Sequence, residues 1–220
     1  MSSPDPEQLR KIAENLAYNQ GRWGDRQVWE GQDAYGYNWG GKKASPSYHR
    51  ARLVAEKLLF PCIDTARPGV IAEIAPGGGR FTAELVRISS ELHLVDLNQA
   101  CIDICKERFK YYEHVHYYKN DGISLEMLPS EHFDVLASYD SLVHVAPEII
   151  RGYVIQGARI LKPEGIIWFH HANRFEPSGH RTDMSGDKMK RFAEEAKLEL
   201  ITQHFLSEGL DCISVLRAKP

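Results

Sequence analysis

The sequence lacks any long apolar run, and it also lacks an excess of charge of either sign. No apolar stretch approaches the ~20 residues that a membrane-spanning helix needs. The first residues, Met-Ser-Ser-Pro-Asp-Pro-Glu, have neither the basic nor the apolar region of a signal peptide. The chain has 27 Lys and Arg against 30 Asp and Glu, and the basic residues are scattered. We therefore expect a cytosolic protein without a membrane span that does not bind nucleic acid.

Cysteine is also scarce. None of the four cysteines forms a Cys-x-x-Cys pair or has a histidine at zinc-ligand spacing, so all four are interpreted as small buried residues. At 220 residues and 43% hydrophobic composition, the chain can bury one substantial core. The prediction is one domain over residues 45–220, preceded by an N-terminal segment over residues 1–44.

The most informative stretch is Val70 to Leu85. A β-branched apolar run breaks at Pro76 and three glycines, after which Phe81, Leu85 and Ile88 recur at helical spacing. This pattern predicts a strand, a glycine turn and a helix. Glycines there let a ligand approach the backbone closely, and the helix N-terminus offers N–H groups to polar or anionic atoms.

The spacing argues against a dinucleotide site, because Thr82 stands where the third glycine of Gly-x-Gly-x-x-Gly should be. Two acids frame the turn: Glu73 precedes Gly77 by four residues, and Asp96 ends the next apolar run. With these residues the stretch resembles motif I and the following acidic loop of class I S-adenosylmethionine-dependent methyltransferases. A strand-to-helix turn in some other α/β domain is the alternative.

Two later segments carry the same resemblance. Tyr-Asp-Ser-Leu-Val-His-Val at 139–145 and Leu-Lys-Pro-Glu-Gly at 161–165 are similar to the segments after strand 4 and before strand 5 of these enzymes. The resemblance covers about residues 70–171. It implies an α/β, Rossmann-like doubly wound sheet of seven strands in the order 3-2-1-4-5-7-6, with strand 7 antiparallel and helices on both faces.

The resemblance also implies S-adenosylmethionine as cofactor. The first loop would hold its methionine part, Asp96 its ribose hydroxyls and Asp121 its adenine amino group, although Asp121-Gly122 also favours an Asx turn. Ala75 departs from the family glycine and leaves room for the cofactor if its φ is negative. The expected cofactor-binding residues are Glu73, Ala75, Gly77, Gly79, Asp96, Leu97, Asp121, Gly122 and Tyr139.

The N-terminal segment has two parts. Leu9, Ile12, Ala13 and Leu16 predict a short amphipathic helix over residues 5–18. Residues 20–41 alternate glycines with large aromatics, contain three of the four tryptophans and show no regular period. Because such rings must lie against something, we interpret this part as a lid over the cofactor and acceptor. Rings that simply cover the outside of the core are the alternative.

Hydrophobic periods and caps predict the remaining elements. The expected helices span 45–60, 99–109, 147–161 and 185–196. The expected strands span 92–95, 115–119, 133–139, 165–169, 198–205 and 211–217. In a doubly wound sheet the ligands bind beyond the carboxyl ends of the strands.

Several polar residues fall at these strand ends. Histidine is the usual proton acceptor when the acceptor is a hydroxyl, so the catalytic candidates are His144, His170 and His171. Strands 4 and 5 are neighbours, so these imidazoles are expected to face one acceptor. The expected substrate-binding residues are Trp39, Asp140, Asn173, His180 and Arg181. Asp140, His144 and His170 could converge on a metal, but no spacing enforces this, and no metal ligand is assigned.

The C-terminal part loosely resembles methyltransferases of glycan and surface-polysaccharide pathways, which implies O-methylation of a sugar hydroxyl or of a sugar phosphate. Fold alone cannot select the substrate. Two alternatives stay open: a nicotinamide-dependent oxidoreductase on the same fold, and a cofactor-binding subunit without catalysis. The sequence leaves a homo-oligomer open.

Overall fold

The computed structural model describes residues 5–31, 38–41, 45–67, 69–176 and 180–219. Tyr35, Gly36 and Tyr37 of the expected lid lie outside these residues. Among the described residues, no helix is both long and apolar enough to cross a membrane.

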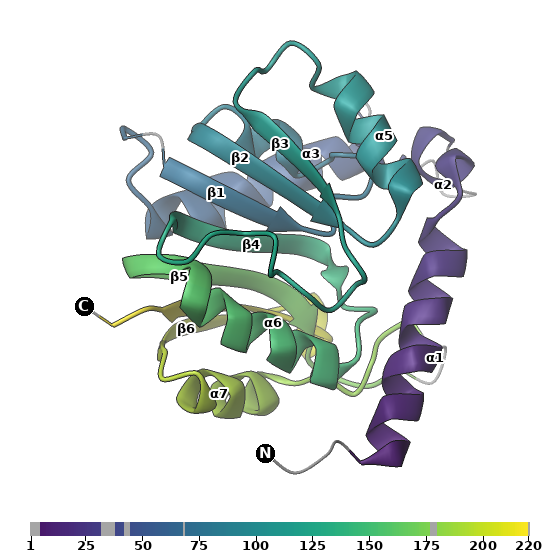
Figure 1. The fold of residues 1–220 in the computed structure, drawn as a ribbon, viewed down its shortest axis with the longest axis vertical. Coiled ribbons are helices and arrows are strands. Elements are labelled where there is room, and N and C mark those ends of the chain that lie inside the picture. Colours follow the sequence, from purple (N-terminus) through teal and green to yellow (C-terminus); the bar gives the residue numbers. More distant parts are fainter. Residues whose placement is uncertain (1–4, 32–37, 42–44, 68, 177–179, 220) are drawn as a thin grey trace.

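The elements alternate between helices and strands through most of the chain (Figure 1). The helices are α1 (Pro6–Trp23), α2 (Arg26–Glu30), α3 (Pro46–Val54), α4 (Thr82–Leu85), α5 (Gln99–Arg108), α6 (Pro147–Ile160) and α7 (Gly186–Glu195). The strands are β1 (Gly69–Ile74), β2 (Ser89–Asp96), β3 (Val115–Lys119), β4 (Phe133–Leu142), β5 (Leu161–Ala172), β6 (Glu199–Leu206) and β7 (Asp211–Arg217). A π-helical turn (Ala55–Leu59) and a 3₁₀ turn (Phe60–Cys62) extend α3, and a second 3₁₀ turn (Ser207–Gly209) precedes β7.

The seven strands form one sheet in the order β3-β2-β1-β4-β5-β7-β6. β1 to β5 pair in parallel, while β7 is antiparallel to both β5 and β6. A helical segment lies between each pair of consecutive strands up to β5 except β3 and β4, and β7 follows β6 through a short turn that reverses the chain. The expected fold, strand order and reversed strand 7 are confirmed.

Side chains alternate between two cores, one on each face of the sheet. On one face, Ile71 and Leu94 pack with Cys105 of α5 and Ala51 of α3. On the other, Ile74 and its neighbours pack with α6 and α7, which lie in front of the sheet in Figure 1. Both faces of the central strands are therefore buried, which explains their nearly continuous apolar sequences.

Three predictions about local structure were wrong. The segment expected to be irregular from residue 20 is helical to Trp23, where α1 continues the face that carries Asn19, and α2 follows. The helix after the glycine turn is only the four residues of α4, since the chain turns into β2 after Val86. β4 and β5 run past their predicted ends at residues 139 and 169.

α1 lies along the edge at which the parallel strands end (Figure 1). Its Asn15 side chain donates to the His144 carbonyl oxygen at 2.9 Å and accepts from the Ala146 N–H at 2.9 Å. Near its C-terminus, the Asn19 carbonyl oxygen accepts from the Asn98 side chain at 3.4 Å. The N-terminal helix thus spans from the loop after β4 to the loop after β2.

Candidate functional site

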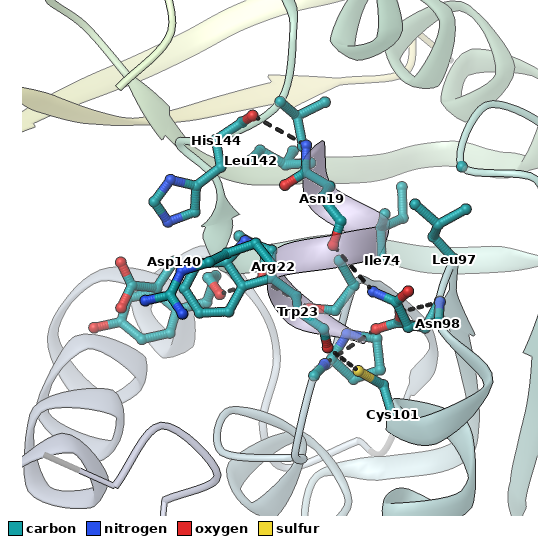
Figure 2. A pocket seen from close by; sticks show the side chains of 18 of the residues that line it. Asn19, Arg22, Trp23, Ile74, Leu97, Asn98, Cys101, Asp140, Leu142 and His144 are labelled. Carbon is teal, nitrogen blue, oxygen red and sulfur yellow. Dashed lines mark hydrogen bonds between the residues drawn. The ribbon is translucent and has the colours of Figure 1, made fainter. Parts of the chain in front are cut away.

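A cavity of about 610 Å³ lies at the carboxyl edge of the sheet, beneath α1. It is lined by the ends of β1, β2 and β4, by the loops that follow them, by α1, and by residues 176, 180 and 181. In Figure 2, Leu97 and Asn98 lie on one side of the cavity and Asp140 and His144 on the other, with Trp23 between them in this view. The cavity is where a doubly wound sheet is expected to bind its ligand.

The glycine turn and Asp96 form one structural unit. The Gly77 N–H donates to Asp96 Oδ2 at 3.2 Å, and the Asn98 N–H donates to Oδ1 at 2.8 Å. Gly77 has a φ of 56°, which glycine adopts without strain. Burial raises the pKa of Asp96 to about 6, although both backbone hydrogen bonds lower it. Asp96 is therefore a buried carboxylate that lines the cavity at neutral pH.

Ala75 has a φ of 54°, whereas a negative φ was expected to leave room for the cofactor at this position. A left-handed alanine costs roughly 1 to 2 kcal/mol. Two contacts hold the backbone there: the Ala75 N–H donates to the Val95 carbonyl oxygen at 2.8 Å, and its own carbonyl oxygen accepts from the Ser141 hydroxyl at 2.8 Å. Ala75 lines the cavity.

Tryptophans of the N-terminal segment form one wall of the cavity. The Trp29 ring packs against Gly77 so closely that a Cβ there would lie 2.5 Å from it. Trp29 donates from its indole N–H to the Trp23 carbonyl oxygen at 2.9 Å, and the two ring centroids are 5.6 Å apart. Glycine at position 77 therefore makes room for an aromatic ring, a role that the sequence reasoning did not anticipate.

His144 lies on the opposite side of the cavity from the loop that follows Asp96. Its ring is tilted over Trp23 with a centroid separation of 5.1 Å. Its Nδ1 is buried and has no hydrogen-bond partner among the described residues. Burial, followed by the charge of Arg181, lowers the pKa of His144 to about 4. The imidazole is therefore neutral at pH 7 and can accept a proton.

Two buried ion pairs flank His144. Arg80 donates to Asp140 Oδ2 at 2.6 Å, and Arg181 donates to both oxygens of Asp211 at 2.6 and 3.0 Å. Burial raises the pKa of Asp140, but the charges of Arg80, His170 and Arg50 and the hydrogen bond from Arg80 together outweigh burial and hold that pKa below its usual range. Asp140 itself has a φ of 56°, and this left-handed residue interrupts the pairing of β4 with β5. Asp140, Arg80 and Arg181 all line the cavity.

His170 and His171 do not face the cavity, contrary to the expectation that they share an acceptor with His144. Both are fully buried. His170 accepts from the Asp140 N–H at 3.1 Å through Nδ1, and its Nε2 lies 3.7 Å from Asp211. His171 uses both ring nitrogens, with the Ala172 carbonyl oxygen at 2.7 Å and the Ser214 hydroxyl at 2.8 Å. β5 continues to Ala172 because β7 pairs with it there, so these residues belong to the strand rather than to the loop beyond it.

Other expected site residues also have structural contacts. Glu73 is buried away from the cavity and accepts from the Thr82 hydroxyl at 2.6 Å, and burial raises its pKa to about 8. Gly79 packs against Phe109. Asn173 donates to the Gly209 carbonyl oxygen and accepts from the Gly186 N–H, both at 2.9 Å.

Asp121 is exposed and forms an Asx turn, which was the alternative to its expected contact with the adenine amino group. Its Oδ1 accepts from the N–H groups of Ile123 and Ser124 at 2.9 and 2.7 Å. The remaining expected residues line the cavity: Leu97, Gly122, Tyr139, Trp39 and His180.

Several cavity residues were not among the expected site residues: Asn15, Asn19, Arg22, Arg50 and Arg80. Trp23 and Trp29 belong to the segment that was expected to cover the site, and both line the cavity. Asn15, Asn19 and Arg22 lie in α1, where no motif marks them. The one available signal was the spacing of Asn15, Asn19 and Trp23, which places them on one helical face.

Comparisons with known proteins agree with this architecture. Residues 72–169 match the profile of a family described as a methyltransferase domain. No curated protein sequence matches the chain. Among solved structures, the chain is similar to the PH0226 protein of Pyrococcus horikoshii OT3, with 19% identity and a TM-score of 0.66 over 80% of this chain and 93% of that one.

Two further similar structures are methyltransferases by name. The N-methyltransferase NodS of Bradyrhizobium japonicum WM9 has 18% identity and a TM-score of 0.62, over 80% of this chain and 98% of that one. The 1,6-didemethyltoxoflavin-N1-methyltransferase of Burkholderia thailandensis was crystallised with 1,6-didemethyltoxoflavin and S-adenosylhomocysteine. It has 14% identity and a TM-score of 0.64, over 100% of this chain and 93% of that one. At these identities the likeness shows a shared fold.

Proposed function

We propose that this chain is an S-adenosylmethionine-dependent methyltransferase, which its match to a methyltransferase-domain profile over residues 72–169 supports, and that it methylates a hydroxyl of a small polar acceptor, a sugar or a sugar phosphate. The observation that carries the proposal is His144, a neutral imidazole with an unpartnered nitrogen beside the cavity. A hydroxyl must lose its proton when it is methylated, and this imidazole can receive it.

The residues at the ends of β1 and β2 fit the cofactor. Asp96 offers two carboxylate oxygens at the cavity wall, suited to accept hydrogen bonds from ribose hydroxyls. Gly77 presents backbone only, Ala75 adds no more than a methyl group although its φ is positive, and the Trp23 and Trp29 rings suit a cationic sulfonium. When bound, S-adenosylmethionine supplies an electrophilic methyl group. Leu97, Gly122 and Tyr139 complete the cofactor side in this proposal.

The acceptor side lies near Asp140 and His144. His144 takes the proton of the acceptor hydroxyl, and the Trp23 ring limits the movement of the imidazole. Asp140, held by Arg80, accepts a hydrogen bond from a second hydroxyl of a polyol. The aromatic wall excludes water from the reacting groups and holds the acceptor in orientation toward the methyl group. Both effects contribute to the rate.

Basic residues favour an acceptor that carries an anionic group. Arg22 lies at the exposed rim of the cavity, and no carboxylate among the described residues pairs with it. Arg50 and Arg181 also line the cavity, although Arg181 is already paired with Asp211. Guanidinium groups bind phosphate oxygens in a bidentate geometry, so a sugar phosphate fits this rim better than an uncharged sugar.

The N-terminal residues 1–44 act as a lid on the methyltransferase domain of residues 45–220. Arg108 of the domain donates to the carbonyl oxygens of Gly40, Gly41 and Gly78, joining this segment to the glycine turn. With α1 and Trp29 also covering the cavity, ligands enter and leave when this segment moves.

A methyl-transfer assay with isotope-labelled cofactor tests the proposal. Sugars, sugar phosphates and small amines serve as acceptors, with wild type, His144→Ala and Arg22→Gln compared. We expect transfer to hydroxyls of sugar phosphates, dependent on His144, and weaker use of these phosphates by Arg22→Gln. Two similar structures are N-methyltransferases by name, so transfer to amines at equal rates in wild type and His144→Ala would replace the hydroxyl acceptor with a nitrogen.

A further inference from the structure

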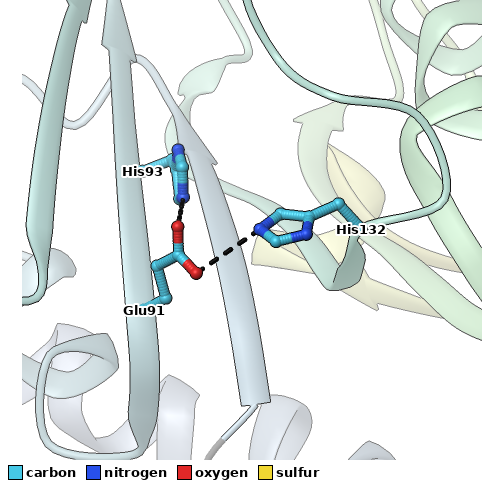
Figure 3. A group of neighbouring side chains, drawn as sticks. All are labelled: Glu91, His93 and His132. Carbon is cyan, nitrogen blue, oxygen red and sulfur yellow. Dashed lines mark hydrogen bonds and ion pairs between the residues drawn. The ribbon is translucent and has the colours of Figure 1, made fainter.

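A second group of histidines lies away from the cavity, on β2, β3 and the turn before β4. Glu91, His93 and His132 each offer one ligand atom, and these atoms all lie within 4.8 Å of one another. Figure 3 shows the Glu91 carboxylate between the two imidazoles. None of the three residues lines the cavity described above.

The fold brings these residues together from separate parts of the chain. Glu91 and His93 are two residues apart on β2, so their side chains share one face of the sheet. β1 lies between β2 and β4 in the sheet. His132 comes directly before β4, so its side chain reaches Glu91 from the opposite side of β1. His116 of β3 lies beside His93 in the register, with ring centroids 4.7 Å apart.

Two of the three separations between these side chains are close to those of a metal centre, and the third is a hydrogen bond that a metal ion would replace. Glu91 Oε1 lies 2.6 Å from His93 Nε2 and 3.6 Å from His116 Nε2, while Oε2 lies 3.4 Å from His132 Nε2. Ligand atoms about 2.0 to 2.1 Å from a tetrahedral Zn²⁺ are about 3.3 Å from one another. Small side-chain rotations would therefore bring the atoms of Glu91, His93 and His132 to a common ion, and His116, next to Glu91, would have to turn toward it.

The surroundings supply the supporting contact that metal-bound histidines usually have. His93 Nδ1 lies 3.1 Å from the Tyr118 hydroxyl, so this nitrogen can donate to the phenol oxygen and leave Nε2 free as a ligand. The Phe133 ring packs edge-on against His93 at a centroid separation of 4.9 Å. The side chains of His116 and His132 are 45% and 36% exposed, which leaves a path for the ion.

From this arrangement we propose that Glu91, His93 and His132 bind a divalent transition-metal ion of the zinc class, with His116 as fourth ligand. Three imidazoles and one carboxylate suit Zn²⁺ and its neighbours, whereas Mg²⁺ and Ca²⁺ prefer oxygen ligands only. This ion takes no part in methyl transfer. None of the proposed ligands lines the cavity, and the Cα atoms of Glu91 and Asp96, five residues apart along β2, are separated by roughly 16 Å.

The ion would instead cross-link β2, β3 and the turn before β4. A ligand that binds the folded chain but not the unfolded one raises the melting temperature in proportion to the logarithm of its concentration. The cluster therefore makes the stability of this sheet edge depend on the metal.

The test uses full-length protein freed of metal with a chelator and titrated with ZnCl₂. We expect one equivalent to bind by calorimetry and the melting temperature to rise as Zn²⁺ is added. His132→Ala and His116→Ala change partly exposed side chains, so both should fold. His132→Ala should lower the affinity by roughly tenfold or more, and Tyr118→Phe, which keeps every ligand, by about tenfold.

His204→Ala is the matched control, because it removes a half-buried strand histidine far along the sheet on β6. It should bind Zn²⁺ like wild type. Co²⁺ in place of Zn²⁺ should give the visible absorption of a tetrahedral centre, lost in His132→Ala. Absence of binding, or equal binding by wild type and His132→Ala, would overturn the proposal and leave the cluster as a hydrogen-bonded network.

Discussion

His144 and His171 both follow the core of a parallel strand, yet only one of them faces the cavity. His144 lies in the loop beyond β4, where the chain has left the sheet, and its Nδ1 has no partner among the described residues. His171 lies within β5, which extends because antiparallel β7 pairs with it as far as Ala172. Both of its ring nitrogens have partners.

The difference shows that a strand's partner decides whether a residue near its end belongs to the site. β4 has parallel neighbours on both sides, and its pairing with β5 is interrupted at Asp140. β5 has one antiparallel neighbour, whose start prolongs the pairing. The following predictions test whether this contrast holds in function.

The largest expected effect is on turnover. His144→Ala removes the proposed proton acceptor and should lower kcat by about 10²- to 10⁴-fold, while affinity for S-adenosylhomocysteine changes little. Initial rates at saturating cofactor, together with calorimetry, separate these quantities. His204→Ala, a histidine that does not line the cavity, is the control. Turnover within a few-fold of wild type would mean that His144 is no more catalytic than His171.

The next effect is on stability. His171→Ala removes a fully buried side chain and leaves the Ser214 hydroxyl without that partner. The free energy of unfolding should therefore fall by about 2 to 4 kcal/mol. Urea denaturation measures this change. Ser214→Ala, which leaves the ring in place, should cost less. Because His171 does not touch the cavity, the folded fraction should keep its kcat, and a loss of more than about tenfold per folded molecule would contradict the contrast.

A smaller effect is expected on cofactor binding. Asp96→Asn keeps the shape of the side chain but has one acceptor oxygen, so affinity for S-adenosylhomocysteine should fall by about 1.5 to 3 kcal/mol. Burial raises the pKa of Asp96 to about 6. As the pH falls below 6, the protonated carboxyl loses acceptor capacity, so wild-type affinity should weaken.

Calorimetry between pH 5 and 8 measures this dependence. Asp96→Asn should show a weaker pH dependence than wild type, since it has no proton to gain at this position. Identical pH profiles for the two proteins would remove Asp96 from the cofactor site. His144→Ala should bind the cofactor like wild type across this range, which separates the cofactor side from the acceptor side.

The sheet could be predicted from the sequence in most of its detail. β-branched runs such as Val70 to Ile74, the cap at Ser185 and the motifs at Gly77 and Asp96 depend on local chemistry, and the structure has a strand, a capped helix and a tight turn there. Ser185 accepts from the Lys188 N–H at 3.2 Å, as a capping residue should.

The cavity could be predicted only in part. Its strand-end residues follow from topology, but Asn15, Trp29 and Arg80 reach it through contacts between segments far apart in sequence. Arg80, for example, pairs with Asp140, sixty residues later. His171 was expected just beyond the end of β5, but it lies within the strand, because the length of β5 depends on its pairing with β7 and not on β5 alone.

The smallest predicted effect concerns how the two histidines are held. Strand pairing fixes His171, whereas α1 helps to fix His144. The Asn15 side chain donates to the His144 carbonyl oxygen and accepts from the Ala146 N–H. Asn15→Ala should therefore loosen this loop by about 1 kcal/mol and lower kcat several-fold without changing the environment of His171.

Hydrogen–deuterium exchange should show this directly, with faster exchange at residues 143–146 and unchanged exchange in β5. Glu14→Ala is the matched control, since Glu14 lies on α1 with its side chain 62% exposed. Two contacts from Thr182 could hold the loop by themselves: its N–H donates to the Val143 carbonyl oxygen, and its hydroxyl donates to that of Val145. Asn19 of α1 also donates to the His144 carbonyl oxygen, at 3.2 Å. If Asn15→Ala exchanges and turns over like Glu14→Ala, the Thr182 contacts and this second bond are sufficient, and Asn15 does not position the base.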